Sequence, residues 1–225
     1  LVGILTVNNP SVAKINRPLF FMDHGLGQFY DVPYNHVPPL PQLVATLGPN
    51  QSFKRWSKNQ FPDARHEIIG SPLNDQRINR IEEYQPNNAK PVVAVSFHFD
   101  RKLCPETRTT FPYFKDAMVP LANHDDFDLV GHAHPRIRER LKPWYEKHGI
   151  PFLREFEDLA KQADLYVMDN SSTLFEFAAL GKPVVVLNAP FYRREVNHGL
   201  RFWEAANVGI QCDSPEELEQ SILKA

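Results

Sequence analysis

The chain has 225 residues, of which 42% are hydrophobic, a composition typical of an ordinary globular protein with one or two domains. Lys and Arg number 25 against 27 Asp and Glu, so the formal net charge is −2 and no global positive field exists to hold a nucleic acid. No apolar run approaches the ~20 residues of a membrane-spanning helix, and Cys104 and Cys212 form neither a disulfide framework nor a Cys-x-x-Cys metal motif. We therefore expect a cytoplasmic protein, with peripheral contact at the inner membrane face left open.

The N-terminal third combines apolar runs with turn residues. The runs 2–7, 18–22 and 43–47 predict strands, and 52–58 predicts one short helix. The second run leads into Asp23, His24 and Gly25, which places polar residues and a glycine at the carboxyl end of a strand, where open α/β sheets bind ligands. His24 is therefore a candidate general base toward an acceptor hydroxyl, and the alternative is a turn histidine beside structural glycines.

A domain boundary is expected between the two halves of the chain. The turn-forming stretch 70–75 is followed by a polar stretch that reaches Asn88. We assign residues 1–72 to a reduced N-terminal α/β region and residues 73–225 to a second domain of ordinary size.

The second domain alternates short apolar strands with short helices. The predicted strands are 91–97, 127–132, 165–168, 183–187 and 208–210, and the predicted helices are 111–121, 137–148, 156–163, 173–180 and 201–206. Ser214 followed by Pro215 and two glutamates predicts the start of a last helix. This alternation is typical of βαβ units around a parallel, Rossmann-type sheet.

The turn after the predicted strand 165–168 has the features of an anion site. The first N–H groups of the following helix have no partner within the helix, and hydroxyl groups stand at the same end. The polar residues at this turn are Asp169, Asn170, Ser171, Ser172 and Thr173. Glu176, one turn into the helix, could accept hydrogen bonds from the vicinal hydroxyls of a ribose. The alternative is that Asp169 or a serine caps the helix and that Glu176 completes a capping box.

A histidine loop follows the predicted strand 127–132. His134 can donate to a phosphate oxygen, and Pro135 keeps His134 extended. A metal site is the alternative, because His132 and His134 form a His-x-His pair with Asp125, Asp126 and Asp128 nearby in sequence. Ligands further along the chain, at other strand ends, are not evident, so we expect no metal.

Taken in order, these motifs resemble the CDP-glycerol glycerophosphotransferase family, enzymes that build or prime teichoic acid-type polymers on a GT-B scaffold. His24-Gly25 resembles the His-Gly loop of the acceptor domain, and the stretch 70–75 resembles the Gly-x-Pro-Arg-x-Asp turn between the domains. His134-Pro135 resembles the His-Pro of the donor domain, and the stretch 169–172 resembles the Asp-Tyr-Ser-Ser that receives the diphosphate. The stretch 175–184 is similar to the helix and Lys-Pro strand that follow.

The resemblance implies a GT-B-like α/β fold and a transferase. The implied enzyme would move glycerol phosphate or a sugar from a CDP- or UDP-linked donor to a hydroxyl of a glycan or polyol-phosphate acceptor, without a metal or other cofactor. His24 would be the base, and His134 and the two serines would hold the diphosphate. Asn170 stands where the family has tyrosine, and Leu73 where it has arginine. The alternatives are a GT-B module that binds nucleotide or polymer without catalysis, and an enzyme similar to nucleotide-sugar 2-epimerases.

Overall fold

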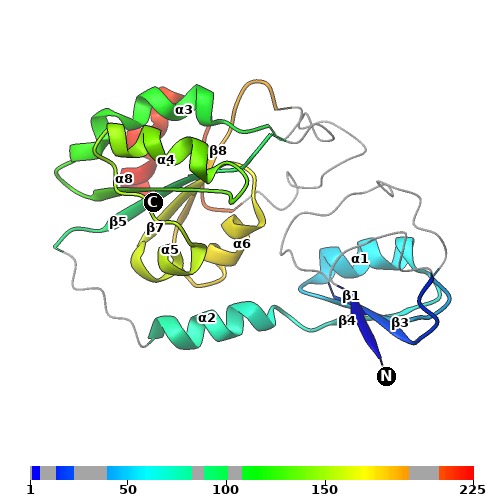
Figure 1. The fold of residues 1–225 in the computed structure, drawn as a ribbon. Helices are drawn as coiled ribbons and strands as arrows, with labels where there is room; N and C mark the ends of the chain where they lie inside the picture. Colours follow the sequence, from blue (N-terminus) through cyan, green and yellow to red (C-terminus); the bar gives the residue numbers. More distant parts are fainter. Residues whose placement is uncertain (1, 6–13, 23–39, 83–88, 101–107, 193–207) are drawn as a thin grey trace.

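A computed structural model describes residues 2–5, 14–22, 40–82, 89–100, 108–192 and 208–225 of the chain. It contains two separate parallel β-sheets, the first with one helix and the second with several, and the helix α2 (Pro72–Glu82) runs between them (Figure 1). No helix within these residues is long and apolar enough to cross a membrane.

The smaller, N-terminal lobe is a four-stranded parallel sheet covered by one helix. Its strands lie in sequence order and are β1 (Gly3–Leu5), β2 (Leu19–Met22), β3 (Leu43–Gly48) and β4 (Arg65–Ile68). Helix α1 (Gln51–Gln60) begins where the side chain of Asn50 accepts a hydrogen bond from the backbone N–H of Phe53. The ring of Phe53 stacks on that of Phe21 at 6.1 Å between centroids, which anchors the helix on one face of the sheet.

The larger, C-terminal lobe is a five-stranded parallel sheet in the order β6-β5-β7-β8-β9. The strands are β5 (Val92–Phe97), β6 (Asp128–Ala133), β7 (Leu165–Met168), β8 (Val184–Leu187) and β9 (Ile210–Cys212). The helices are α3 (Phe111–Met118), η3 (Pro120–Asn123), α4 (Arg138–Lys147), α5 (Phe156–Gln162), α6 (Ser172–Ala178), η4 (Pro215–Glu217) and α8 (Leu218–Lys224).

Both faces of this sheet are buried, since every residue of β5, β7 and β8 is buried and successive residues of a strand point to opposite sides. In β5, Val93 and Val95 belong to a core shared with α3, α4 and α8, whereas Val92 and Ala94 belong to a core shared with α5 and α6. The helices therefore form two layers with the sheet between them (Figure 1). Continuous apolar strands are the pattern that the sequence predicts for such a sheet.

The strand order creates a topological switch point. From β5 the chain proceeds to β6 on one side and then returns to β7 on the other side, so β5 lies between them. The connection to β6 runs over one face through α3, and the connection from β7 to β8 runs over the other face through α6. In open α/β sheets the crevice outside the carboxyl ends of such strands is where ligands bind.

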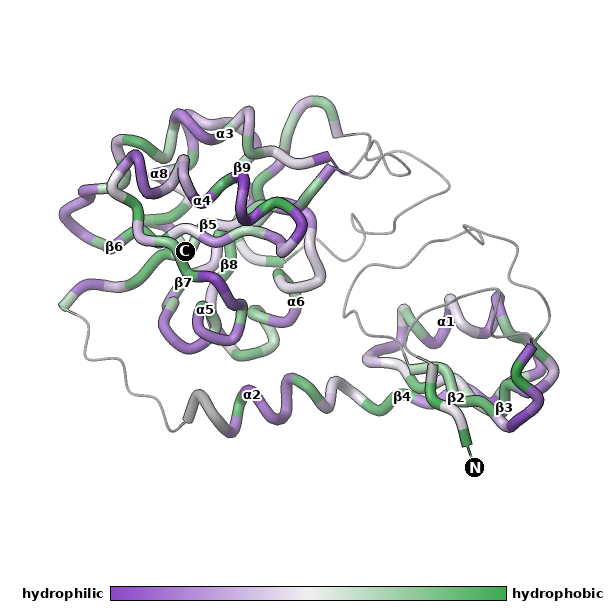
Figure 2. The backbone as a smooth tube through the Cα atoms, in the orientation of Figure 1, coloured by the Kyte–Doolittle hydropathy of each residue, from purple (hydrophilic) through white to green (hydrophobic). Residues whose placement is uncertain are grey.

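Two elements near the expected domain boundary differ from the sequence-based prediction. Residues 65–68 form β4, and the part of the expected turn and polar stretch from Pro72 to Glu82 is the helix α2. Ser71 stands before this helix and accepts a 3.4 Å hydrogen bond from the N–H of Asn74, and Pro72 occupies the first helical position. These start signals are present in the sequence, but α2 has no long apolar run to accompany them (Figure 2).

Smaller differences occur at element ends. The helix predicted over 111–121 ends at Met118, because Pro120 begins the 3₁₀ helix η3. The last strand begins at Ile210 rather than at residue 208, since Gly209 has a positive φ of 64° at a turn. The helix predicted over 201–206 lies outside the described residues.

We expect Gly131→Ala to destabilise the protein by about 1–3 kcal/mol through overpacking. A Cβ atom on Gly131 would lie 2.4 Å from the ring of Tyr145, which is fully buried and fixed by hydrogen bonds from its hydroxyl to Val95 and His132 carbonyls. Urea unfolding measures the change, and Lys147→Ala, an exposed position at the end of α4, is the control. Equal stability of the two variants would contradict the packing described.

Candidate functional site

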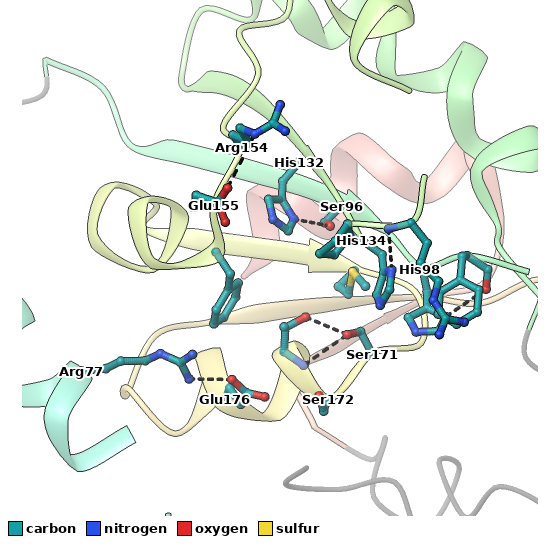
Figure 3. Close-up of a pocket in the computed structure, with 16 residues that line it drawn as sticks. Arg77, Ser96, His98, His132, His134, Arg154, Glu155, Ser171, Ser172 and Glu176 are labelled. Atoms are coloured by element: carbon teal, nitrogen blue, oxygen red, sulfur yellow. Dashed lines mark hydrogen bonds and ion pairs between the residues drawn. The ribbon is translucent and has the colours of Figure 1, made fainter. Parts of the chain in front are cut away.

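A cavity of about 500 Å³ opens at the carboxyl edge of the larger sheet, at the switch point between β5 and β7 (Figure 3). Its walls come from five parts of the chain: helix α2, the end of β5, the loop after β6, the segment before α5 and the β7–α6 turn. The residues that line it are Arg77, Ser96, His98, Phe99, His132, His134, Pro135, Arg136, Arg154, Glu155, Phe156, Met168, Ser171, Ser172, Thr173 and Glu176.

The three hydroxyl residues of the β7–α6 turn face this cavity, as the sequence analysis expects. Ser171 is the N-cap of α6, and its Oγ accepts hydrogen bonds from the backbone N–H of Thr173 at 3.3 Å and from the Thr173 hydroxyl at 3.0 Å. The capping alternative is therefore correct for Ser171, and the same residue also lines the cavity. The N–H of Ser172, at the first helical position, has no acceptor within the helix.

Asp169 lies behind the cavity wall and does not line it. Its carboxylate accepts hydrogen bonds from the backbone N–H groups of His98 at 2.8 Å, Thr110 at 3.0 Å and Asn170 at 2.7 Å. Burial raises the pKa of Asp169 to about 6, although these N–H donors act to lower it. Asp169 thus fastens the loop after β5, the start of α3 and the β7–α6 turn to one another.

Asn170 does not line the cavity either. Its side-chain amide donates to the carbonyl oxygen of Arg108 at 3.2 Å and to the hydroxyl of Tyr192 at 3.0 Å, and the Tyr192 hydroxyl donates to the same carbonyl at 2.7 Å. The sequence analysis expects Asp169 and Asn170 at the bound diphosphate. In the structure the Asp169 carboxylate bonds to backbone N–H groups, and the Asn170 NH2 group bonds to the Arg108 carbonyl and the Tyr192 hydroxyl.

His134 stands at the mouth of the cavity beside other rings. Its Nδ1 accepts a hydrogen bond from the backbone N–H of Arg136 at 3.1 Å, so in the neutral ring the proton is on Nε2. The centroids of the His98 and Phe99 rings lie 4.8 Å and 4.5 Å from that of His134. The guanidinium of Arg136 covers Phe99 at 4.6 Å, which brings a positive charge to the same rim.

His132 is a buried partner of Ser96 and does not form a metal pair with the aspartates. Its Nδ1 lies 2.7 Å from the Ser96 hydroxyl, and burial, aided by the charge of Arg138, lowers its pKa to about 4. Asp128 begins β6, whereas His132 and His134 lie at its other end, so Asp128 and the aspartates before it stand at the opposite edge of the sheet. Among the residues that the structure describes, no group of three or more side chains could hold a metal ion.

Glu176 lines the cavity and is held by Arg77, a residue that the sequence analysis missed. The guanidinium of Arg77 donates to the Glu176 carboxylate at 2.5 Å and to Glu157 at 2.8 Å (Figure 3 draws the first pair). Glu176 is too far into α6 to complete a capping box, since that role belongs to the third helical position. The start signals of α2 at Ser71 and Pro72 were the available clue to Arg77, but nothing local indicates which residue 99 positions away it would meet.

Three of the expected site residues belong to the segment that follows β2. Asp23, His24 and Gly25 lie outside the described residues. The structure therefore locates His134, Pro135, Ser171, Ser172, Thr173 and Glu176 around one cavity.

Two parallel-sheet α/β lobes, with a cavity at the carboxyl edge of the second sheet, define a GT-B fold. A structure of the wall teichoic acid polymerase TagF matches with a TM-score of 0.66 at 15% identity, over 98% of this chain and 63% of that chain. Another, of TagF soaked with CDPG, matches with a TM-score of 0.65 at 15% identity, over 98% of this chain and 62% of that one. A third TagF structure has a TM-score of 0.60 at 17% identity and covers 95% and 60%.

This likeness establishes the fold, and the chain spans about 62% of the TagF chain that it matches. No protein-family model matches the sequence, and no curated protein matches it. The GT-B fold that the motifs predict is therefore confirmed by structure alone.

The raised pKa of Asp169 predicts an unusual pH dependence. An acid with a folded pKa of about 6 and an ordinary value of 3.8 binds more protons in the folded state, so its contribution to stability falls as the pH rises from about 4 to about 6. Over this window we expect the free energy of unfolding of the wild-type protein to fall by up to about 3 kcal/mol relative to that of Asp169→Asn. Urea unfolding of both proteins across the window measures this, and a constant difference between them would contradict it.

Proposed function

We propose that this chain binds the nucleotide-diphosphate donor of a transferase, which moves glycerol phosphate or a sugar to a hydroxyl acceptor. The observation that carries the proposal is the cavity at the switch point, which Ser171, Ser172, Thr173 and His134 line together. Its volume of about 500 Å³ lies within the 300–1,000 Å³ typical of small-molecule sites. The GT-B fold supports the same class of function, although fold alone does not assign one.

The diphosphate would lie between the β7–α6 turn and the loop after β6. The hydroxyl groups of Ser171 and Ser172 and the first N–H group of α6 would donate to phosphate oxygens from one side, and the Nε2–H of His134 from the other. The exposed guanidinium of Arg136, held over Phe99, would offset negative charge at the rim. Asp169 contributes indirectly, because its three backbone bonds fix the segments that carry these donors.

The nucleoside would occupy the other end of the cavity. Phe156, Arg154 and Glu155 line that wall, and the Glu176 carboxylate stands one helical turn from the serines. A carboxylate can accept a hydrogen bond from each of two vicinal hydroxyls, which suits the ribose of a nucleotide. The spacing of one helical turn, about 5.4 Å, is comparable to the step from a ribose to its diphosphate.

The chemistry would be a base-assisted displacement. An acceptor hydroxyl loses its proton to a base and attacks the donor, and the bond between the transferred group and the leaving nucleotide phosphate breaks. Negative charge then accumulates on the leaving phosphate, where the donors around Ser171, Ser172 and His134 would stabilise it. His24 is our candidate for the base, and displacement without a metal cofactor, in the cytoplasm, belongs to the same proposal.

We expect CDP to raise the melting temperature of the protein in the presence of a chelator. At a concentration of one hundred times the Kd, binding stabilises the folded state by about 2.7 kcal/mol, which is a shift of several degrees for a chain of this size. Replacing both Ser171 and Ser172 by alanine should remove the shift. UDP tested in parallel reports which base is preferred, and thermal unfolding measures each shift.

The control must allow for the cap that Ser171 provides to α6. Asn50→Ala removes the equivalent cap of α1, in the other lobe, so it lowers the melting temperature by a similar mechanism without touching the cavity. The shift produced by CDP should be intact in Asn50→Ala. Protection of the double-serine variant to the same degree as the control would show that the diphosphate does not bind at this turn.

A further inference from the structure

Helix α2 is attached to the larger lobe by polar side chains. Between Pro72 and Asn79, the buried residues are Asn74 and Arg77, which are 3% and 6% exposed, whereas Leu73 is 49% exposed. Asn74 and Arg77 are three positions apart and therefore share one face of the helix. A surface helix normally packs through an apolar stripe, so an attachment made by an amide and a guanidinium calls for another explanation.

The polar face of α2 meets the cavity wall in a closed network. The Asn74 side chain donates to the backbone carbonyl of Glu176 at 3.0 Å and accepts from the Arg77 guanidinium at 2.9 Å. The same guanidinium donates to Oε2 of Glu176, and its other nitrogens donate to Oε1 of Glu157 at 2.8 Å and 2.9 Å. The ring of Phe156 lies 5.0 Å from the guanidinium carbon.

This network fixes one oxygen of Glu176 and leaves the other for a ligand. Arg77 holds Oε2, while within the described part of the chain no hydrogen bond to Oε1 is found. Glu176 itself lines the cavity and is only 7% exposed, so its carboxylate is held in one orientation before any ligand arrives. Orienting a binding group in advance removes an entropic cost from ligand binding.

The charges explain why Arg77 is suited to this role. A buried guanidinium must be compensated, and Glu157 supplies a second carboxylate that stays with Arg77 whatever Glu176 binds. Burial acts to lower the pKa of Arg77, but hydrogen bonds and charges from Glu157 and Glu176 raise it overall. Arg77 is therefore charged throughout the accessible pH range and holds the Glu176 carboxylate at every pH.

We propose that Arg77 is a positioning residue that presents the Glu176 carboxylate to the vicinal hydroxyls of a ribonucleoside diphosphate. Helix α2, which runs between the lobes, is thereby a part of the donor site. This inference rests on the proposed function and adds to it a determinant of sugar specificity. It makes the discrimination between ribose and deoxyribose depend on a residue outside the larger sheet.

The test is a set of calorimetric titrations with CDP, 2′-deoxy-CDP and inorganic pyrophosphate. The unmodified protein should bind CDP about tenfold or more tightly than 2′-deoxy-CDP, as expected for a hydrogen bond to a charged group. In Arg77→Met this ratio should fall toward one, because the carboxylate is no longer oriented. Binding of pyrophosphate should be unchanged, since the serine turn and His134 are intact.

Two further variants separate the positioning role from a general loss of structure. Arg140→Met removes an exposed arginine of α4 that does not line the cavity and should leave all three affinities unchanged. Arg77→Lys keeps a charge but not the forked geometry, so it should give an intermediate ratio even if Arg77→Met folds poorly.

The outcomes distinguish this inference from the function on which it rests. Failure of the unmodified protein to bind any of the three probes would overturn both. Binding of CDP with the same ribose discrimination in Arg77→Met and Arg77→Lys would overturn only the role of Arg77. An equal loss of affinity for CDP and for pyrophosphate would also overturn it, because Arg77 would then support the whole cavity rather than the ribose end.

Discussion

The site depends on one constraint, namely that parallel strands on both sides of β5 deliver their carboxyl ends to the same edge of the sheet. A buried carboxylate then makes that edge rigid. The Asp169 carboxylate accepts hydrogen bonds from the backbone N–H groups of His98 and Thr110, which are distant in sequence, and from that of its neighbour Asn170. Asp169, which does not line the cavity, therefore positions the hydrogen-bond donors that do.

The sequence predicts the larger sheet well because its strands are buried on both faces and read as continuous apolar runs, as in 91–97 and 183–187. It also predicts Ser171, Ser172, Thr173 and His134 at one place, since each follows a strand of the same parallel sheet. The prediction is less successful for Asp169 and Asn170. A polar residue after a strand can face either the crevice or the interior, and only the packing of the loop after β5 and the start of α3 decides which.

Helix α2 shows a different limit of sequence reasoning. Over residues 72–79 the buried positions are Asn74 and Arg77 rather than an apolar stripe, and the partners of Arg77 are 80 and 99 positions away. Hydrophobic patterns report burial against a core, whereas an ion pair between distant elements leaves no local signal. The ion pair also links α2 to the ligand site, because Arg77 bonds a carboxylate that lines the cavity.

The central claim is that the cavity between β5, β6 and β7 binds a nucleotide diphosphate. A crystal structure of the protein soaked with CDP, without added metal, tests it most directly. The account predicts electron density for the diphosphate beside Ser171, Ser172 and His134, with the ribose hydroxyls at Glu176. CDP bound elsewhere on the protein, or an empty cavity at a concentration that saturates the protein in solution, would contradict it.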